Sequence, residues 1–260
     1  MIGFRIGAQT ACFAQPFRKA LHIVAQLGCE GVQIDARREL RPAELSDTGL
    51  RQLRKMLNDL NLRVCAVAFP TRRGLSCQED LQRRVEAVIE AMRFASRLEA
   101  RVLICTLGSL PELAEAPERA TLPDVLATLS SHSHRLGVRL AAQAGDTSPQ
   151  VLADFLATLP EGSLGLDLHP GQLITHGLSP QEFVSVVGQH IAHVHAVDAV
   201  LDLAGGSSTE VELGRGSVDF PALVGQLEEH SYRDWLTIER RHSSQPAEDV
   251  GNAVKYLRSL

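Results

Sequence analysis

The chain has 260 residues, of which 44% are hydrophobic and 22% are charged, and its formal net charge is −5. This composition is typical of a globular protein with a full core, and the acidic balance argues against a nucleic-acid partner, which usually selects a basic surface. No stretch is apolar for long enough to span a bilayer, and the N-terminus does not resemble a signal peptide, so we expect no membrane partner. Five cysteines without C-x-x-C spacing favour a reducing compartment, and a cytoplasmic location is therefore expected.

Strand and helix patterns alternate along the whole chain. Short apolar runs predict eight strands, at residues 5–9, 31–36, 62–69, 101–106, 138–143, 164–169, 191–197 and 235–239. Amphipathic patterns predict a helix after each strand, at residues 16–27, 46–60, 79–98, 122–136, 148–159, 179–187, 219–229 and 247–260. Expected N-caps are Ser46, Ser148, Ser179 and Asp219. Gly28 and Gly137 fall just past helix ends, where a left-handed residue is favoured.

Eight strands that alternate with helices predict a parallel sheet. With the length of the chain, the count predicts an α/β protein whose residues 1–260 form a single (β/α)8 TIM-barrel domain. No glycine-rich phosphate-binding motif follows a strand, which argues against a nucleotide-binding fold. Residues 199–217 are expected to form an irregular surface loop or a lid. This loop and Arg215 leave a homo-oligomer open as a possibility.

The segment IAHVHAVD, residues 191–198, holds the most informative pattern in the chain. His193 and His195 lie two apart in an apolar strand, so both imidazoles point to the same side. Two further predicted strands end in ligand-type residues, namely His169 and Glu239. Because active sites of TIM barrels lie at the C-terminal ends of the strands, these side chains are expected to converge.

Four motifs occur in order: GVQID (31–35), HVHAVD (193–198), LGRGSVDF (213–220) and WLTIER (235–240). They resemble the xylose isomerase-like TIM-barrel superfamily of sugar isomerases and epimerases, which also includes endonuclease IV-type DNA repair enzymes. The resemblance implies a sugar or sugar-phosphate isomerase or epimerase that holds one divalent metal ion. In that family the metal ligands are a Glu ending strand five, an Asp ending strand six, a His on strand seven and a Glu ending strand eight.

Two of the four ligand positions depart from this pattern. His195 and Glu239 match it, but strand five ends in Gln143 and strand six offers His169. Asp167 is an alternative on strand six, although period two places it one layer deeper on the same face. The predicted metal set is therefore Gln143, His169, His195 and Glu239, which suits Mn, Zn, Fe or Co better than magnesium. The alternative for each histidine is an ordinary hydrogen-bonded residue near a strand end.

The predicted catalytic residues are Glu239 and His195. A glutamine cannot accept a proton, so epimerisation by two opposing glutamates is not expected with Gln143 at strand five. A metal-polarised carbonyl and Glu239 as the single base remain sufficient for proton transfer at the neighbouring carbon.

Substrate binding is predicted for Arg72, Arg215, His193, Gln33 and Asp198. Arginine forks suit phosphate or carboxylate groups, and the loops that follow barrel strands share one face, so the partner is expected to be a small sugar or an anionic sugar derivative. The alternative is that these arginines are solvated and form surface ion pairs. His193 is expected to orient a neighbour, and Asp198 either contacts a ligand histidine or caps its own loop.

Three functions follow from these patterns. The first is a metal-assisted isomerase or epimerase-like enzyme with Glu239 as base. The second is a degenerate barrel that binds a small sugar-like ligand without turnover, which the residues at positions 143 and 169 favour. Endonuclease IV-type repair is the least favoured, because that chemistry needs more metal ligands than the strand ends provide and the net charge opposes DNA.

Overall fold

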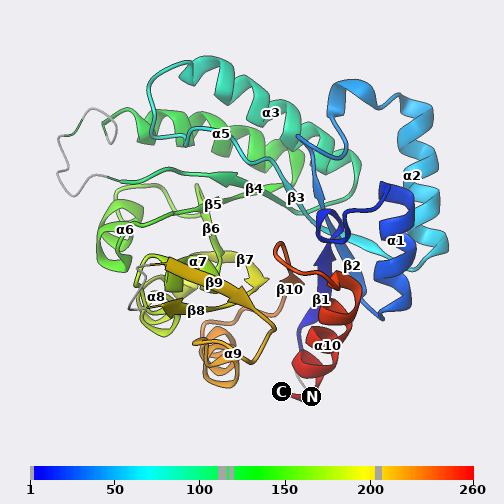
Figure 1. The fold of residues 1–260 in the computed structure, drawn as a ribbon. Coiled ribbons are helices and arrows are strands. Elements are labelled where there is room, and N and C mark those ends of the chain that lie inside the picture. Colours follow the sequence, from blue (N-terminus) through cyan, green and yellow to red (C-terminus); the bar gives the residue numbers. More distant parts are fainter. Residues whose placement is uncertain (1–2, 111–115, 117–119, 203–206) are drawn as a thin grey trace.

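The computed structural model describes residues 3–110, 116, 120–202 and 207–260. Eight parallel strands close into a barrel in the order β1-β10-β7-β6-β5-β4-β3-β2 (Figure 1). The barrel strands are β1 (Arg5–Gln9), β2 (Gly31–Asp35), β3 (Arg63–Ala68), β4 (Val102–Thr106), β5 (Arg139–Gln143), β6 (Gly165–Leu168), β7 (Ile191–Ala196) and β10 (Trp235–Ile238). The predicted TIM barrel is therefore confirmed, and each predicted strand has its counterpart.

Helices surround the barrel (Figure 1). They are α1 (Phe17–Gln26), α2 (Asp47–Asp59), α3 (Leu81–Arg97), α5 (Leu122–Leu136), α6 (Pro149–Leu156), α7 (Pro170–Thr175), α8 (Pro180–Val187), α9 (Phe220–Glu229) and α10 (Pro246–Ser259), with short 3₁₀ turns η1 (Thr10–Phe13), η2 (Pro42–Glu44) and η3 (Gly188–His190). In α2 the buried residues are Leu50, Leu53 and Leu57, whose spacing forms one apolar stripe against the strands. Across the described ranges, no helix is both long and apolar enough to cross a membrane.

The predicted helix caps are confirmed. The four expected N-cap side chains each accept a backbone N–H from the first turn of their helix, and they are Ser46, Ser148, Ser179 and Asp219. Gly28 and Gly137 adopt φ angles of 80° and 65°, the left-handed region in which glycine carries no steric cost.

Trp235 packs across the N-terminal ends of neighbouring strands. Trp235 begins β10 and lies so close to Gly31 that a Cβ atom there would be 2.6 Å from the indole ring. The Arg5 guanidinium covers the same ring at 4.3 Å from its centroid. Buried polar residues instead follow the other end of the strands, where Glu239 and His169 come directly after β10 and β6. The buried polar groups therefore gather at the C-terminal end, where TIM barrels place their chemistry.

The segment after β7 differs from the prediction of an irregular loop at residues 199–217. Strands β8 (Asp198–Asp202) and β9 (Ser207–Val211) form an antiparallel hairpin beside α7 (Figure 1). The β-branched and apolar residues of both strands favour pairing, and Ser207 and Ser208, which lie inside the predicted loop, belong to β9. Gly205 and Gly206, which suggested a lid, lie outside the described residues.

Candidate active site at the C-terminal ends of the strands

The four predicted metal ligands come from four neighbouring barrel strands. Gln143 ends β5, His169 follows β6, His195 lies in β7 and Glu239 follows β10. His169, His195 and Glu239 are buried, and each offers a ligand atom within 4.8 Å of the others. The Nε2 atom of His195 lies 3.4 Å from Glu239 Oε2, and that of His169 lies 3.8 Å from Glu239 Oε1. The strand ends therefore bring three of the four predicted ligands together, His169, His195 and Glu239.

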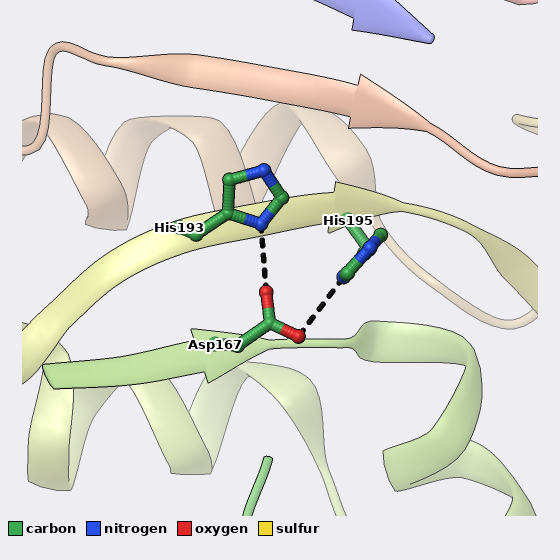
Figure 2. Close-up of side chains that lie close together, drawn as sticks. All are labelled: Asp167, His193 and His195. Carbon is green, nitrogen blue, oxygen red and sulfur yellow. Dashed lines mark hydrogen bonds and ion pairs between the residues drawn. The ribbon is translucent and has the colours of Figure 1, made fainter. Parts of the chain in front are cut away.

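A buried carboxylate beneath this set fixes the histidines. Asp167 of β6 accepts hydrogen bonds from His193 Nδ1 at 2.7 Å, His195 Nδ1 at 3.0 Å and Gln143 Nε2 at 2.7 Å. Figure 2 shows both imidazoles of β7 turned toward this one carboxylate. Burial raises the pKa of Asp167, but the neighbouring His195 and the hydrogen bonds from both histidines outweigh it, so the pKa lies well below its ordinary value. An ionised Asp167 has no proton to donate, and both histidines therefore carry a proton on Nδ1.

The hydrogen bonds account for the close grouping of Asp167, His193 and His195 without a metal ion. Both ring nitrogens of His193 have hydrogen-bond partners, because Nδ1 donates to Asp167 and the Thr237 hydroxyl donates to Nε2 at 2.9 Å. His193 therefore orients Asp167 from below and does not reach the cavity, as expected for a residue one layer deeper.

His195 differs from His193 in having a free acceptor. Its Nε2 atom is buried and has no hydrogen-bond partner within the described part of the chain. With the proton on Nδ1, the Nε2 lone pair faces the Glu239 carboxylate, which is a second acceptor. Two buried acceptors at 3.4 Å are unfavourable unless a proton or a cation lies between them. This pair therefore fits a divalent metal ion, because ligand histidines commonly donate the other ring N–H to a carboxylate.

Glu239 is held as an anion. Its Oε2 accepts from Gln9 Nε2 at 3.3 Å, and its Oε1 contacts the Arg241 guanidinium. Burial raises the pKa of Glu239, but the neighbouring His169, His195 and Arg241 outweigh it and lower the pKa to about 2. The carboxylate is thus ionised at neutral pH, as a general base or a metal ligand requires.

A cavity of about 620 Å³ opens above these residues. Gln143, His195 and Glu239 line its deep end, together with Gln33. Gln33 is almost fully buried, and its Oε1 has no partner among the described residues. Gln33, a predicted substrate contact, therefore lines the cavity and has an unused hydrogen-bond acceptor.

The two arginines predicted to bind substrate do not line this cavity. Arg72 is exposed in the segment after β3, and Arg215 is 74% exposed and paired with Glu212 at 3.3 Å. Arg38 and Arg241 line the cavity instead. The physical reason is loop direction, because spacing places a residue in a loop but does not show which way the loop folds.

Asp198, also predicted to bind substrate, holds its own loop. Its carboxylate accepts the backbone N–H groups of Ala199 at 2.9 Å, Gly214 at 3.0 Å, Gly216 at 2.8 Å and Val218 at 3.1 Å. Of the two roles left open for Asp198, the structure therefore shows loop capping. This geometry explains the glycine at position 216 of the motif LGRGSVDF, because a Cβ there would lie 2.1 Å from Asp198 Oδ1.

Sequence reasoning missed the contribution of the first strand. Gln9 ends β1, donates to Glu239 and accepts from the Cys12 thiol at 3.4 Å. Cys12 in turn accepts the N–H of Arg240 at 3.0 Å, and burial raises the pKa of the thiol, which keeps it protonated. The position of Gln9 at a strand end was the available signal.

Comparison with known proteins shows what this barrel is similar to. The family described as xylose isomerase-like TIM barrel matches residues 21–260. A xylose isomerase domain protein from Planctomyces limnophilus shares 23% identity at a TM-score of 0.83, over 92% of this chain and 91% of that chain. Among proteins with curated descriptions, none matches the chain.

Two further solved structures have similar folds. A xylose isomerase-like TIM barrel protein from Mycobacterium smegmatis, in complex with magnesium, shares 19% identity at a TM-score of 0.75, over 94% of this chain and 88% of that chain. A D-allulose 3-epimerase from Methylomonas sp. shares 17% identity at a TM-score of 0.76, over 98% of this chain and 97% of that chain. At these identities the likeness shows the fold, and the family match extends over most of the sequence. The chain belongs to the xylose isomerase-like TIM barrel family.

Proposed function

We propose that the protein is a metal-assisted isomerase or epimerase-like enzyme that moves a proton next to the carbonyl of a small sugar or an anionic sugar derivative. The observation that carries this proposal is the buried pair of His195 Nε2 and the Glu239 carboxylate, 3.4 Å apart at the deep end of the cavity. The D-allulose 3-epimerase and the magnesium complex among the similar structures support the same reaction class and a divalent metal.

His195 and Glu239 would hold the metal ion, and the amide oxygen of Gln143 is available as a neutral ligand because its nitrogen is bound to Asp167. A bound divalent ion at this position would polarise the substrate carbonyl and acidify the neighbouring C–H bond. With a single carboxylate ligand, we propose Mn, Zn, Fe or Co in preference to magnesium.

Glu239 is the proposed base. Its low pKa keeps it ionised. It accepts a proton from the hydroxyl-bearing carbon next to the carbonyl and returns the proton to the former carbonyl carbon, while the hydroxyl proton passes to the former carbonyl oxygen. Gln143 has no basic group to act on the opposite face of the substrate. The site therefore favours isomerisation, or exchange on one face, over epimerisation by two opposing bases.

The cavity walls provide the groups that would orient the substrate. Gln33 has a free acceptor for a sugar hydroxyl, and Arg38 lines the cavity with a guanidinium that suits a phosphate or a carboxylate. The proposed substrate is therefore a sugar phosphate or a sugar acid of a size that fits about 620 Å³.

The test combines metal content with proton exchange. Protein purified without chelator is analysed by plasma mass spectrometry, and a panel of ketose and aldose phosphates is followed by NMR in D₂O for loss of the α-proton signal. We expect about one metal equivalent, and a loss of roughly 10²- to 10⁴-fold in exchange rate for Glu239→Gln.

A ligand-binding barrel without turnover is the second candidate, and the neutral side chain of Gln143 favours it. Binding of a sugar phosphate in the cavity with no proton exchange, in both wild type and Glu239→Gln, would select this candidate over the enzyme.

A further inference from the structure

The Nδ1 atom of His169 faces a hydrogen-bond donor, whereas that of His195 faces an acceptor. It follows β6 and is the N-cap residue of α7, and its Nδ1 accepts the backbone N–H of Gln172 at 3.2 Å. That N–H is shared with the carbonyl oxygen of His169 at 3.0 Å. The Nε2 atom is buried without a partner within the described residues, and the side chain is 8% exposed.

A ring nitrogen that faces an N–H donor must present its lone pair. The neutral imidazole has a single proton, so in His169 this proton lies on Nε2, whereas in His195 it lies on Nδ1 and points to Asp167. The two histidines therefore present different groups to the site, an N–H from His169 and a lone pair from His195.

We infer that His169 is an N–H donor that positions the Glu239 carboxylate, and that it stays outside the coordination of any metal ion held by His195 and Glu239. Ligation through Nε2 would move the proton to Nδ1, where it would face the N–H of Gln172 at 3.2 Å and leave two donors opposed. The metal part of this inference rests on the proposed function, and the proton position does not.

The geometry is suited to a positioning residue. His169 Nε2 lies 3.8 Å from Glu239 Oε1, so a rotation that closes the gap by about 1 Å makes a hydrogen bond. The same oxygen contacts Arg241, while Oε2 faces His195 and Gln9. A donor on the Oε1 side therefore fixes which oxygen of Glu239 faces His195.

Two substitutions separate the functions of the two ring nitrogens. In His169→Asn, the side-chain oxygen takes the place of Nδ1 as the helix cap, and the donor near Glu239 is lost. In His169→Gln, the longer amide reaches the place of Nε2, and the cap is lost. His195→Asn is the matched substitution at the proposed ligand.

The first measurement is the ring protonation of the metal-free protein. Long-range ¹H–¹⁵N spectra of protein labelled in its histidine rings, at about pH 8.5 where ordinary imidazoles are neutral, distinguish Nδ1–H from Nε2–H. We expect Nε2–H for His169 and Nδ1–H for His193 and His195, with the resonances assigned from the variants. A proton on Nδ1 of His169 would overturn the inference.

The second measurement is binding of Zn²⁺ or Co²⁺ alone, followed by calorimetry. We expect His169→Asn to keep its affinity within about 3-fold of wild type, and His195→Asn to lose about 100-fold or more. Equal losses in the two variants would also overturn the inference. If wild type binds neither ion, the metal part of the proposed function fails, while the ring spectra still decide the position of the His169 proton.

Discussion

Replacing Asp167 with asparagine tests whether this carboxylate sets the proton position of His195. The wild-type carboxylate accepts from three donors: His193 Nδ1, His195 Nδ1 and Gln143 Nε2. An asparagine has the same shape but one acceptor and one NH₂ group. With the oxygen toward His193, the NH₂ group faces His195 and Gln143. The Gln143 amide can then flip, and His195 must move its proton from Nδ1 to Nε2.

Stability and metal affinity are expected to respond differently. Each of the three hydrogen bonds changes from charge-assisted to neutral, a loss of about 1 kcal/mol each, offset in part because a buried charge is removed. We therefore expect a decrease of about 1–3 kcal/mol in the free energy of unfolding. Metal affinity should fall by about 10- to 100-fold, because the Nε2 lone pair that faces Glu239 is replaced by an N–H.

The assays are urea unfolding followed by circular dichroism, and calorimetric titration with Zn²⁺. Asp59→Asn is the control, since Asp59 is 60% exposed and pairs with Lys55 on the same helix, so a change of at most about 0.5 kcal/mol is expected. Asp167→Asn protein that folds and binds Zn²⁺ as wild type does would refute the reasoning from proton position.

The remaining predictions concern the loop, the substrate and the metal charge. Gly216→Ala should cost about 2–4 kcal/mol in urea unfolding, because its Cβ would lie 2.1 Å from Asp198 Oδ1. Gly225→Ala is the control, since its Cβ would meet nothing within 4 Å among the described residues, and an unchanged or raised stability is expected. Arg38→Ala should weaken binding of ketose phosphates by about 10-fold while Arg72→Ala leaves it unchanged, as equilibrium titration would show; equal effects would contradict the assignment of Arg38. His169→Asp keeps a capping oxygen and adds a negative charge near His195 and Glu239, so Mn²⁺ affinity measured by calorimetry should rise about 10-fold or more, and an unchanged affinity would show that the charge around the site does not limit binding.

Local sequence patterns predict the barrel because they arise from local geometry. Period-two and helical spacing depend on neighbouring residues only, so the strand and helix order follows directly. Short elements without such a period escape this reasoning. The helix α7 spans six residues and begins with Pro170 and Gly171, which are residue types typical of turns. The strands β8 and β9 lie in a stretch of sequence rich in glycine and serine, which favours a loop assignment.

The site is predictable only where the barrel itself fixes direction. His195 and Glu239 were identifiable because they lie at the C-terminal ends of barrel strands, where TIM barrels gather their functional side chains. The sequence does not predict which ring nitrogen of His169 carries the proton, because this depends on a hydrogen bond from the Gln172 N–H that exists only after α7 forms. Loop arginines were the least predictable, because a loop can direct equivalent residues such as Arg38 and Arg72 to or away from the cavity.

The two departures from the family pattern act on the cavity in the same direction. Gln143 and His169 each stand where a carboxylate is expected, and Asp167 is withdrawn into bonds with both β7 histidines. Glu239 and Asp35 are the carboxylates along the described cavity lining, and they are balanced there by Arg38 and Arg241. A phosphate about 6 Å from an additional carboxylate would be repelled by about 1–3 kcal/mol at the dielectric constant of a partly exposed site. Replacing two carboxylates removes this repulsion and also removes most of the anionic ligands expected for the metal. The same loss of negative charge therefore weakens binding of a hard cation and favours an anionic sugar over a neutral one.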